Sequence, residues 1–516
     1  MKSKATSKRL GRPSSRRDIL LACLSGILMG VTFLNFHLWL LAWVALVPLL
    51  LAIKGKGYRT SFWLSYLAGI VFFAVVLHWL CSLVFWVGGV VLLGLLLLVF
   101  YLAVYWGLFG LLVSFAREKL GVPVWISGAA LWVVLEYVES KLFTGFGWAL
   151  IGHTQAYNQK MIQWSSVGGV FIVSAIIVFA NLMIYSAIVE RRRRVLRIVG
   201  ALATFAFIPL GETFVRPNQT GKSLRVAVVQ GNFWQDVMWS PEYSGDSLAV
   251  YESLSDEAVR RGAELIVWPE SAIPGFLEMD APVESGVKQY AQRNAVPLLL
   301  GAKRAVRAEQ TDDWQLYNSA YFISDQGQIA DRYDKMHLAP FGEYVPLRNL
   351  FPFLNMIVPP MADFSPGDRR TIFNLNGTRF GVLICFETVF PDLARALARD
   401  DTDFLITITN VAWYGRSAAA FQDLAMCIFR AVENRMWLVR AANSGISCFI
   451  DPSGALNSIV EEEREIVFVR GWSVQNINAG KGFSLYRQIG DVFVLISGVW
   501  LAVVIAVGWR RRRSSA

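Results

Sequence analysis

Long apolar runs constrain this chain more than any other feature of its sequence. A helix needs about 20 apolar residues to cross a bilayer, or a few fewer where the bilayer is thin. The runs cover residues 19–36, 38–53, 62–84, 89–115, 122–138, 167–189, 198–210 (the weakest) and 492–509. We therefore predict a polytopic α-helical membrane domain over residues 1–211, with about seven helices after a basic tail. A last transmembrane helix and a second basic tail should occupy residues 490–516.

The composition agrees with a membrane protein that also has a soluble part. Hydrophobic residues make up 55% of the chain and charged residues only 17%, which is too apolar for an ordinary soluble protein. The first run has no small-residue cleavage site after it, and further runs follow. We therefore expect a retained helix there and not a signal peptide.

Basic residues alternate between the two ends of the predicted helices. They gather in the first tail and around residues 54–59, 117–119, 191–197 and 510–513, whereas the intervening loops hold only Lys141 and Lys160. Because basic loops stay in the cytoplasm, both termini should be cytoplasmic and residues 212–489 should lie outside. In a Gram-negative bacterium, this describes a multi-pass protein of the inner membrane with a periplasmic domain.

The net charge of +10 belongs to the membrane part. Residues 1–211 and 490–516 hold 23 basic and 6 acidic residues, whereas residues 212–489 hold 26 basic and 33 acidic residues. An acidic outer segment should not attract nucleic acid. The five cysteines and four histidines form no CxxC or Cys/His cluster, so we expect neither a metal site nor a disulfide scaffold.

Strands and helices alternate along residues 212–489. We expect strands at residues 224–230, 264–268, 297–301, 319–324, 380–384, 404–409, 438–442, 447–451 and 466–469, and helices at residues 247–261, 284–294 and 418–436. An exposed hairpin turn is expected at residues 325–328. Buried strands that alternate with helices are typical of one large α/β domain.

Three short stretches of this domain carry reactive side chains. Residues 380–387 read FGVLICFE, so Cys385 ends a buried strand just before a helix start, where backbone N–H groups favour the thiolate. Residues 268–271 read WPES, and Glu270 at a strand end faces the crevice where α/β folds bind ligands. Residues 332–338 read RYDKMHL and supply Lys335. Each residue alone has an ordinary structural explanation, and only their combination indicates a site.

In this order, the three stretches resemble the nitrilase, or carbon–nitrogen hydrolase, superfamily. The resemblance covers residues 224–469 and implies a four-layer α-β-β-α sandwich with a triad of Glu270, Lys335 and Cys385. Joined to eight apolar runs, such a domain resembles the apolipoprotein N-acyltransferase family. Further matching stretches are residues 142–148, 229–232, 340–346, 410–415 and 443–445.

The resemblance also implies roles for six further residues. Glu343 would be a supporting catalytic residue that orients Lys335 or Glu270, and the backbone N–H of Phe386 would bind an oxyanion. Many family members have tyrosine in place of Phe386, which affects only side-chain contacts. Contacts with substrate are expected at Trp239, Trp413, Glu387 and Trp148.

The activity implied by the resemblance is transfer of an acyl chain from a membrane phospholipid to the N-terminal amine of a diacylglyceryl-cysteine apolipoprotein. The triad suits this chemistry, with Cys385 as nucleophile, Glu270 as base and Lys335 as oxyanion partner. Exchange of a thioester for an amide needs no ATP or metal, so we expect no cofactor, and we expect a monomer. The alternatives are a membrane-tethered nitrilase-type amidase and a receptor with an inactive domain.

Two other stretches bear on access to the membrane. Glu136 and Glu139 flank the loop at residues 142–148 and are expected to be interfacial and solvated. Residues 350–361 are very apolar, yet three prolines prevent a regular helix. We expect this segment to dip into the outer leaflet and guide acyl chains to Cys385, with a buried flap as the alternative.

Overall fold

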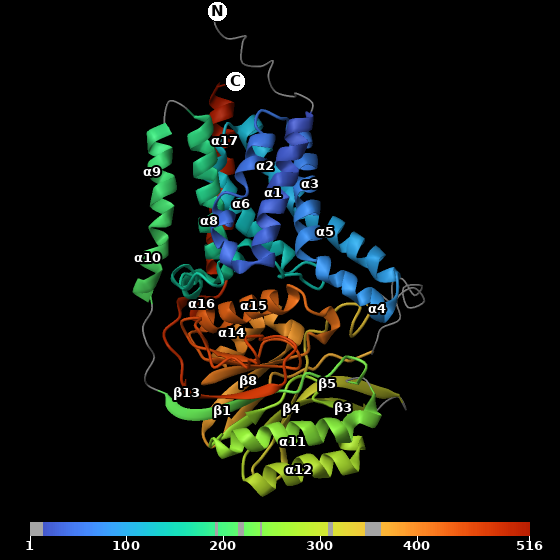
Figure 1. Ribbon diagram of the computed structural model, residues 1–516. Coiled ribbons are helices and arrows are strands. Elements are labelled where there is room, and N and C mark those ends of the chain that lie inside the picture. The colour runs from blue at the N-terminus through green and yellow to red at the C-terminus, as the bar shows by residue number, and fades with distance from the viewer. Residues whose placement is uncertain are drawn as a thin grey trace, which may run out of the picture. The chain divides into compact units, whose positions relative to one another are not determined.

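The structure, a computed structural model, describes residues 14–190, 194–214, 221–237, 240–307, 313–345 and 363–515. The chain forms two compact units, each with its own architecture (Figure 1). The helical unit comprises Met1–Val84, Val91–Val215 and Ile489–Ala516. The α/β unit comprises Phe85–Val90 and Arg216–Gln488.

Long apolar helices build the helical unit. Among the described residues, six helices are long and apolar enough to cross a membrane. They are α1 (Arg16–Leu34), α3 (Tyr58–Val76), α5 (Val90–Leu120), α8 (Ser165–Val189), α9 (Arg194–Phe205) with α10 (Phe207–Gly211), and α17 (Val492–Ser515). The predicted polytopic helical part of the fold is thereby confirmed.

Two of the predicted runs do not form long helices. Residues 38–53 divide between a 3₁₀ helix, η2 (Phe36–Trp43), and a short helix, α2 (Val47–Ala52). Pro48 lies in the first turn of α2, and proline cannot continue a helix from the preceding turn because it has no N–H and its ring clashes there. Residues 122–138 form α6 (Val124–Glu139), a helix of only 16 residues.

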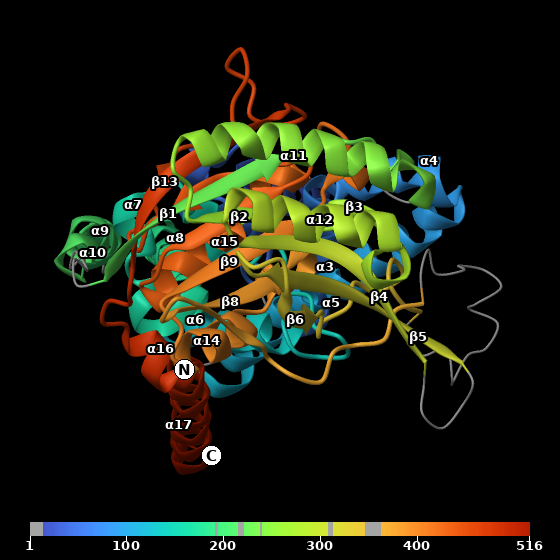
Figure 2. The same ribbon diagram turned by 90° about the horizontal axis from the view of Figure 1, so that it is seen from below.

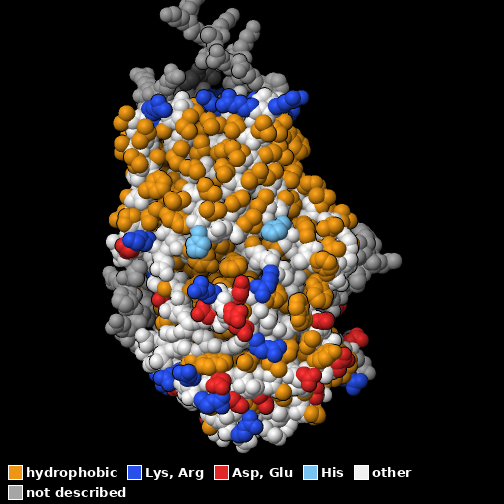
Figure 3. All heavy atoms as spheres, in the orientation of Figure 1, with side chains coloured by type: hydrophobic (Ala, Val, Ile, Leu, Met, Phe, Trp, Pro, Cys, Tyr) orange, Lys and Arg blue, Asp and Glu red, His pale blue; other side chains and the backbone are white. Residues whose placement is uncertain are grey.

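The surface of the helical unit separates apolar from basic side chains. Figure 3 shows hydrophobic side chains over the flanks of this unit and Lys and Arg side chains gathered at one end. The most exposed large apolar residues of these helices include Leu20, Val195, Leu202 and Leu495. Contiguous apolar surface of this extent is rare on soluble proteins and suits contact with hydrocarbon.

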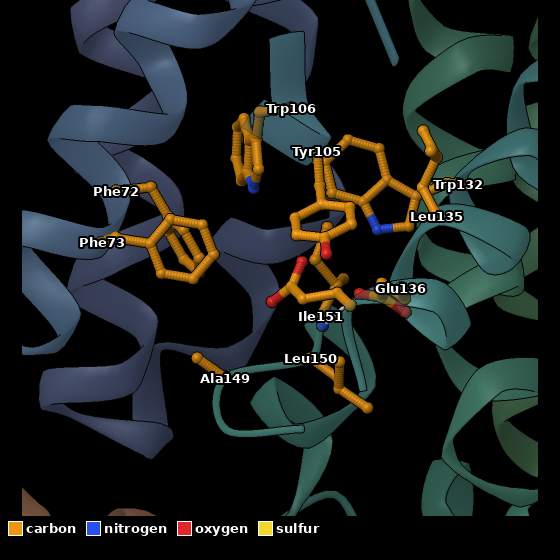
Figure 4. A pocket seen from close by; sticks show the side chains of 11 residues that line it. Phe72, Phe73, Tyr105, Trp106, Trp132, Leu135, Glu136, Ala149, Leu150 and Ile151 are labelled. Atoms are coloured by element: carbon orange, nitrogen blue, oxygen red, sulfur yellow. Dashed lines mark hydrogen bonds between the residues drawn. The ribbon is translucent and has the colours of Figure 1, made fainter. Parts of the chain in front are cut away.

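The carboxylates of Glu136 and Glu139 lie inside the helical unit. They are 5% and 4% exposed, and Figure 4 shows Glu136 among the residues that line a small cavity. Its Oε1 accepts a hydrogen bond from the backbone N–H of Ile151 at 2.7 Å. The prediction that both residues are solvated is wrong, because the segment after α6 turns back over them and its η4 (Ile151–Gln155) is itself buried.

Two sheets form the centre of the α/β unit (Figure 2). In the described part of the chain, the first sheet has seven strands in the order β13-β1-β2-β4-β5-β6, with β3 beside β4, and the second has six in the order β12-β11-β10-β9-β8-β7. The strands of the first sheet are β1 (Lys222–Gln230), β2 (Leu265–Val267), β3 (Ile273–Phe276), β4 (Leu298–Arg307), β5 (Trp314–Ile323), β6 (Ile329–Asp334) and β13 (Gly471–Ala479). Those of the second are β7 (Ile372–Leu375), β8 (Thr378–Ile384), β9 (Phe404–Thr409), β10 (Leu438–Ala442), β11 (Cys448–Ile450) and β12 (Leu456–Asn457).

Helices cover the outer faces of both sheets, as Figures 1 and 2 show. The first sheet carries α11 (Ser244–Arg260) and α12 (Ala281–Asn294), and the second carries α14 (Pro391–Arg399) and α15 (Ala419–Asn434). Apolar side chains of both sheets meet in one core, and those of the first sheet meet α11 and α12 in another. The predicted α-β-β-α sandwich is confirmed.

The directions of the strands bring several strand ends to one edge. Strands β1, β2 and β4 run parallel, and so do β8, β9 and β10. Strand β6 also runs parallel to β4, because β5 is antiparallel to both. The residues that follow β2, β6, β8 and β9 therefore lie at the carboxyl ends of strands, where α/β folds place their sites.

The end of the α/β unit differs from the expectation. Residues 466–469 were predicted as a strand, but Phe468 has φ 56°, a left-handed conformation that a strand does not tolerate. The strand is instead β13, which pairs antiparallel with all of β1. The sequence of β13 is half polar because the strand lies at the edge of the sheet. It therefore lacks the apolar run from which the other strands were predicted. The predicted hairpin turn at residues 325–328 is confirmed, since the N–H of Ser324 donates to the carbonyl of Gln328 at 2.8 Å.

Helices α1 and α3 approach closely where α1 has a glycine. A Cβ at Gly26 would collide with the carbonyl oxygen of Ala68 and lie 3.0 Å from the Cβ of Val71. Small residues permit such close packing of membrane helices.

We expect Gly26→Leu to destabilise the helical unit by about 1–3 kcal/mol or more, because the two backbones must separate. The measurement is the melting temperature of the detergent-purified protein. Gly94→Leu on α5 is the matched control, since no described atom outside the local backbone of α5 lies within 4 Å of the Cβ that it adds. Equal melting temperatures for the two variants would contradict this account of the packing.

Candidate active site

Cys385 directly follows β8 and opens a short 3₁₀ helix, η10 (Cys385–Val389). The residue is half-buried and has φ 52°. A non-glycine residue in this conformation costs about 1–3 kcal/mol and often marks a functional turn. The first N–H groups of η10 have no partner within the helix. The N–H of Phe386 is among them.

Glu270 follows β2 and is held from both sheets. Its Oε1 accepts a hydrogen bond from Nδ2 of Asn318 at 2.7 Å, and its Oε2 accepts one from the backbone N–H of Asn410 at 2.8 Å. Asn410 follows β9 of the second sheet. The thiol of Cys385 lies close enough to Glu270 to lower the pKa of this carboxyl group. Gly301 makes room for this strand end, because a Cβ there would lie 2.6 Å from the Cα of Glu270.

Lys335 follows β6 and supplies a buried positive charge. Its side chain is 1% exposed, and Nζ lies 2.9 Å from Glu343 and 3.8 Å from Oε1 of Glu270. The backbone N–H of Ala339 donates to Oε2 of Glu343 at 2.7 Å and so fixes that carboxylate. A buried charge is stable only when it is paired, and here two carboxylates pair with one ammonium group.

Asn318 links the two carboxylates, and sequence interpretation missed it. Its Nδ2 donates to Oε1 of Glu270 at 2.7 Å and to Oε1 of Glu343 at 2.8 Å. An amide nitrogen has two N–H groups, so both bonds can form at once. One feature of the sequence could have indicated Asn318. It shares one face of β5 with every second residue that follows, and these are the core residues Ala320 and Phe322. A polar side chain in such a position usually has a specific partner.

Burial and neighbouring charges shift the pKa values of Glu270, Lys335 and Cys385. Burial raises the pKa of Glu270, Lys335 opposes this shift, and Glu343 adds to it. Burial, followed by the Glu270 carboxylate, raises the pKa of the Cys385 thiol. Burial by itself would lower the pKa of Lys335, but Glu343 and Glu270 together raise it above its usual value. Lys335 is therefore charged at neutral pH.

Cys385, the predicted nucleophile, rests as a thiol. The position of Cys385 between a strand and a helix start predicted a thiolate, and this prediction is wrong. Loss of water and the nearby carboxylate of Glu270 raise the pKa of the thiol more than the charge of Lys335 lowers it. A base must therefore remove the proton as the sulfur attacks, and Glu270 is close enough to that thiol for each group to shift the pKa of the other.

Glu387 supports the site from within the protein. It is fully buried, and both carboxylate oxygens accept hydrogen bonds from the chain itself. The donors are the hydroxyl of Tyr333 at 2.7 Å and the backbone N–H groups of Met336 at 2.7 Å, His337 at 3.1 Å and Ile384 at 2.8 Å. These bonds tie the strand end of Lys335 to that of Cys385. The expected contact between Glu387 and substrate does not fit this placement.

The tryptophans expected to contact substrate have different surroundings. Trp413 is half-buried and packs edge to face against Trp86, with ring centroids 5.7 Å apart. Trp148 is buried in the helical unit against Trp79, at 5.2 Å. Trp239 and residues 350–361 lie outside the described residues. Substrate contacts at these positions stay predictions.

A buried polar network lies next to the nucleophile turn. Oγ1 of Thr388 is 3.0 Å from the carbonyl oxygen of Cys385 and 3.0 Å from Oδ1 of Asp423. Arg440 donates from Nη2 to Asp423 at 2.7 Å and from Nη1 to Sγ of Cys427 at 3.1 Å. Cys427 thus belongs to this buried network, whereas Cys385 lies near Glu270 and Lys335.

Comparison with known proteins identifies the family. The carbon-nitrogen hydrolase model matches residues 225–470, and the model of the apolipoprotein N-acyltransferase N-terminal domain matches residues 25–183. The apolipoprotein N-acyltransferase of Geobacter metallireducens is 38% identical over 514 residues, which cover 96% of this chain and 96% of that protein. The chain belongs to the apolipoprotein N-acyltransferase family.

A second relative agrees with membership of the apolipoprotein N-acyltransferase family. The enzyme of that name from Vibrio vulnificus is 30% identical, over 98% of this chain and 99% of that protein. A solved structure of an amidase from Nesterenkonia sp. aligns with 55% of this chain and 97% of its own at 17% identity, with a TM-score of 0.38. Bacterial relatives and apolar helices together make the chain a bacterial membrane protein.

The charge of Glu343 raises the pKa of Glu270, so it should set the acidic limb of the pH profile of this family member. Glu270 can serve as the predicted base only when ionised, so the rate should rise as the pH rises through its elevated pKa. The Glu343→Gln variant lacks the negative charge that raises the pKa of Glu270. The acidic limb of its pH profile should therefore move to lower pH, even though its maximal rate falls. The measurement is the rate of acylation of Cys385 between pH 4 and 9 (about 0.5-unit steps resolve such a shift). A limb that stays in place or moves upward would contradict this coupling.

Proposed function

We propose that the chain transfers an acyl chain from a membrane phospholipid to the N-terminal amine of a diacylglyceryl-cysteine apolipoprotein. The observation that carries the proposal is the convergence of Glu270, Lys335 and Cys385 at one edge of the sandwich in a member of this family. All three come from one chain, so a monomer suffices. We further propose a membrane domain at residues 1–211, a catalytic domain at 212–489 and a last membrane helix at 490–516.

The first half of the reaction forms a thioester. Glu270 takes the thiol proton while Sγ of Cys385 attacks the carbonyl carbon of the phospholipid ester. The negative charge that develops on the carbonyl oxygen is stabilised by the ammonium of Lys335 and the N–H of Phe386. The ester C–O bond then breaks, Glu270 returns the proton to the departing oxygen, and a lysophospholipid leaves.

The second half moves the acyl chain to the acceptor. The α-amine of the lipoprotein has an ordinary pKa of about 8, so a substantial share is neutral near pH 7–8. Its nitrogen attacks the thioester carbonyl, Glu270 accepts the proton, and the C–S bond breaks. The proton passes to the sulfur, so the resting thiol returns as the amide forms. Glu343 and Asn318 keep Lys335 and Glu270 in place through both halves.

The amidase alternative uses the same triad but ends in hydrolysis. The two functions differ in what happens to the acyl group when no lipoprotein is present: an amidase passes it to water, whereas an N-acyltransferase retains it on the cysteine. Large apolar surfaces on the helical unit favour a lipid-handling enzyme over a hydrolase of small amides.

Cys385→Ala should abolish acylation, with a loss of at least about 10³-fold, as expected for removal of a nucleophile. Mass spectrometry of the wild type incubated with phospholipid alone should show one added acyl chain on Cys385, and it should persist until a diacylglyceryl-cysteine peptide is added. Cys81→Ala is the matched control, because Cys81 is exposed and belongs to the helical unit. Acylation at Cys427 or Cys448, or rapid release to water, would refute the assignment.

The basic end of the helical unit supports cytoplasmic termini and a periplasmic catalytic domain. In a Cys81→Ser background, a cysteine at Gln326 in the exposed β5–β6 turn should react with an impermeant thiol reagent on intact spheroplasts. A cysteine at Ser514 should react only after lysis, and the parent protein gives the background. The opposite labelling pattern would invert the proposed orientation.

A further inference from the structure

A row of polar side chains leads away from the triad across the first sheet. Strands β4 and β5 pair so that Lys303 lies opposite Asn318, and the carbonyl of Asn318 accepts the N–H of Lys335 at 2.9 Å. Residues opposite each other in a sheet point to the same face. That face lies between the two sheets, as shown by the core residues Leu299, Ala320 and Tyr333. Lys303, Asn318 and Lys335 thus share the inner face.

On the inner face of β4, Lys303 is the first residue after the one that lies against Glu270. Gly301, two residues earlier on β4, lies against Glu270, so Lys303 is the next residue on that face. Adjacent strands are about 4.8 Å apart, which puts the backbones of Lys303 and Lys335 roughly 10 Å apart. The Lys303 side chain is half-buried, and burial lowers its pKa to about 8. An anion bound beside it would stabilise the charged form.

A phospholipid carries an anion at a matching distance from the reacting ester. Six bonds of about 1.5 Å separate the carbonyl carbon of the glycerol C1 ester from phosphorus, which gives at most about 8 Å. With the ester at Cys385 and its oxygen near Lys335, the phosphate can reach the far end of the row. We propose that Lys303 binds the phosphodiester of the acyl donor and selects it over glycerol esters that lack a phosphate. The assignment rests on the proposed function.

The chemistry of the acceptor makes such a selection useful. A diacylglyceryl-cysteine lipoprotein carries the same kind of glycerol esters as the donor, so the ester group cannot tell the two substrates apart. The donor alone has a negatively charged phosphodiester next to those esters. A charge-assisted hydrogen bond from an ammonium to a phosphate oxygen is stronger than a neutral one, and Lys303 is placed to make it.

The test compares two donors in the acylation half-reaction of the full-length enzyme in mixed micelles. One donor is a diacyl phospholipid and the other is diacylglycerol with the same acyl chains. Acylation of Cys385 is followed by intact mass against donor concentration for the wild type, Lys303→Met, Lys303→Arg and Lys288→Met. Lys288 lies on α12, which covers the opposite face of the same sheet. Its ammonium group pairs with Glu284 of the same helix. Melting temperatures establish that each variant is folded.

Lys303→Met should raise the half-saturating phospholipid concentration at least about tenfold, the loss expected for one charge-assisted hydrogen bond. Its maximal rate and its half-saturation with diacylglycerol should stay near wild type, and Lys303→Arg and Lys288→Met should resemble the wild type with both donors. An unchanged half-saturation in Lys303→Met, or an equal loss with both donors, would overturn the assignment. If the wild type acylates Cys385 with neither donor, the proposed function itself fails, and the assignment with it.

Discussion

One buried ammonium group between two carboxylates is the interaction on which the active edge of the α/β unit depends. Burying an isolated charge costs several kcal/mol, and removal of one partner from a buried pair typically costs about 3–5 kcal/mol. These costs are offset only when Lys335 has both Glu270 and Glu343 beside it. Asn318 donates a hydrogen bond to each carboxylate and so holds both of them next to the ammonium group. The geometry that the proposed chemistry needs is therefore also a condition for the stability of this edge.

The same burial decides how the chemistry is organised. Because Glu270 and the loss of water raise the thiol pKa, the cysteine is protonated at rest and is activated only when the carboxylate can take its proton. A nucleophile of this kind is protected from adventitious reaction, since the thiolate is the reactive form. The burial of Glu270 and Lys335 would also limit the access of water to a thioester beside them. Both features suit an enzyme that must hold an acyl group until its acceptor arrives.

Polar bonds between the two sheets keep the strand ends in register. Asn410 donates its backbone N–H to Glu270 and its amide to Gln235 at 2.9 Å, and the amide of Asn443 donates to the carbonyl of Phe233 at 2.8 Å. Glu387 does the same work between the strand ends of Lys335 and Cys385. Apolar packing holds the sheets together but is not directional, whereas these hydrogen bonds specify position. This explains why several asparagines and acids of the domain are fully buried.

The sequence by itself determined the membrane helices, the α/β sandwich and the three triad residue types, because these depend on local periodicity and on side chains that directly follow buried strands. Only the tertiary structure decided the break at Pro48, the burial of Glu136 and Glu139, and the pairing of the half-polar β13 with β1. It also decided the roles of Asn318 and Glu387 and the protonated state of Cys385. Partners far apart in the chain set each of these, and a residue's pKa, burial and hydrogen bonds depend on which side chains the fold brings beside it.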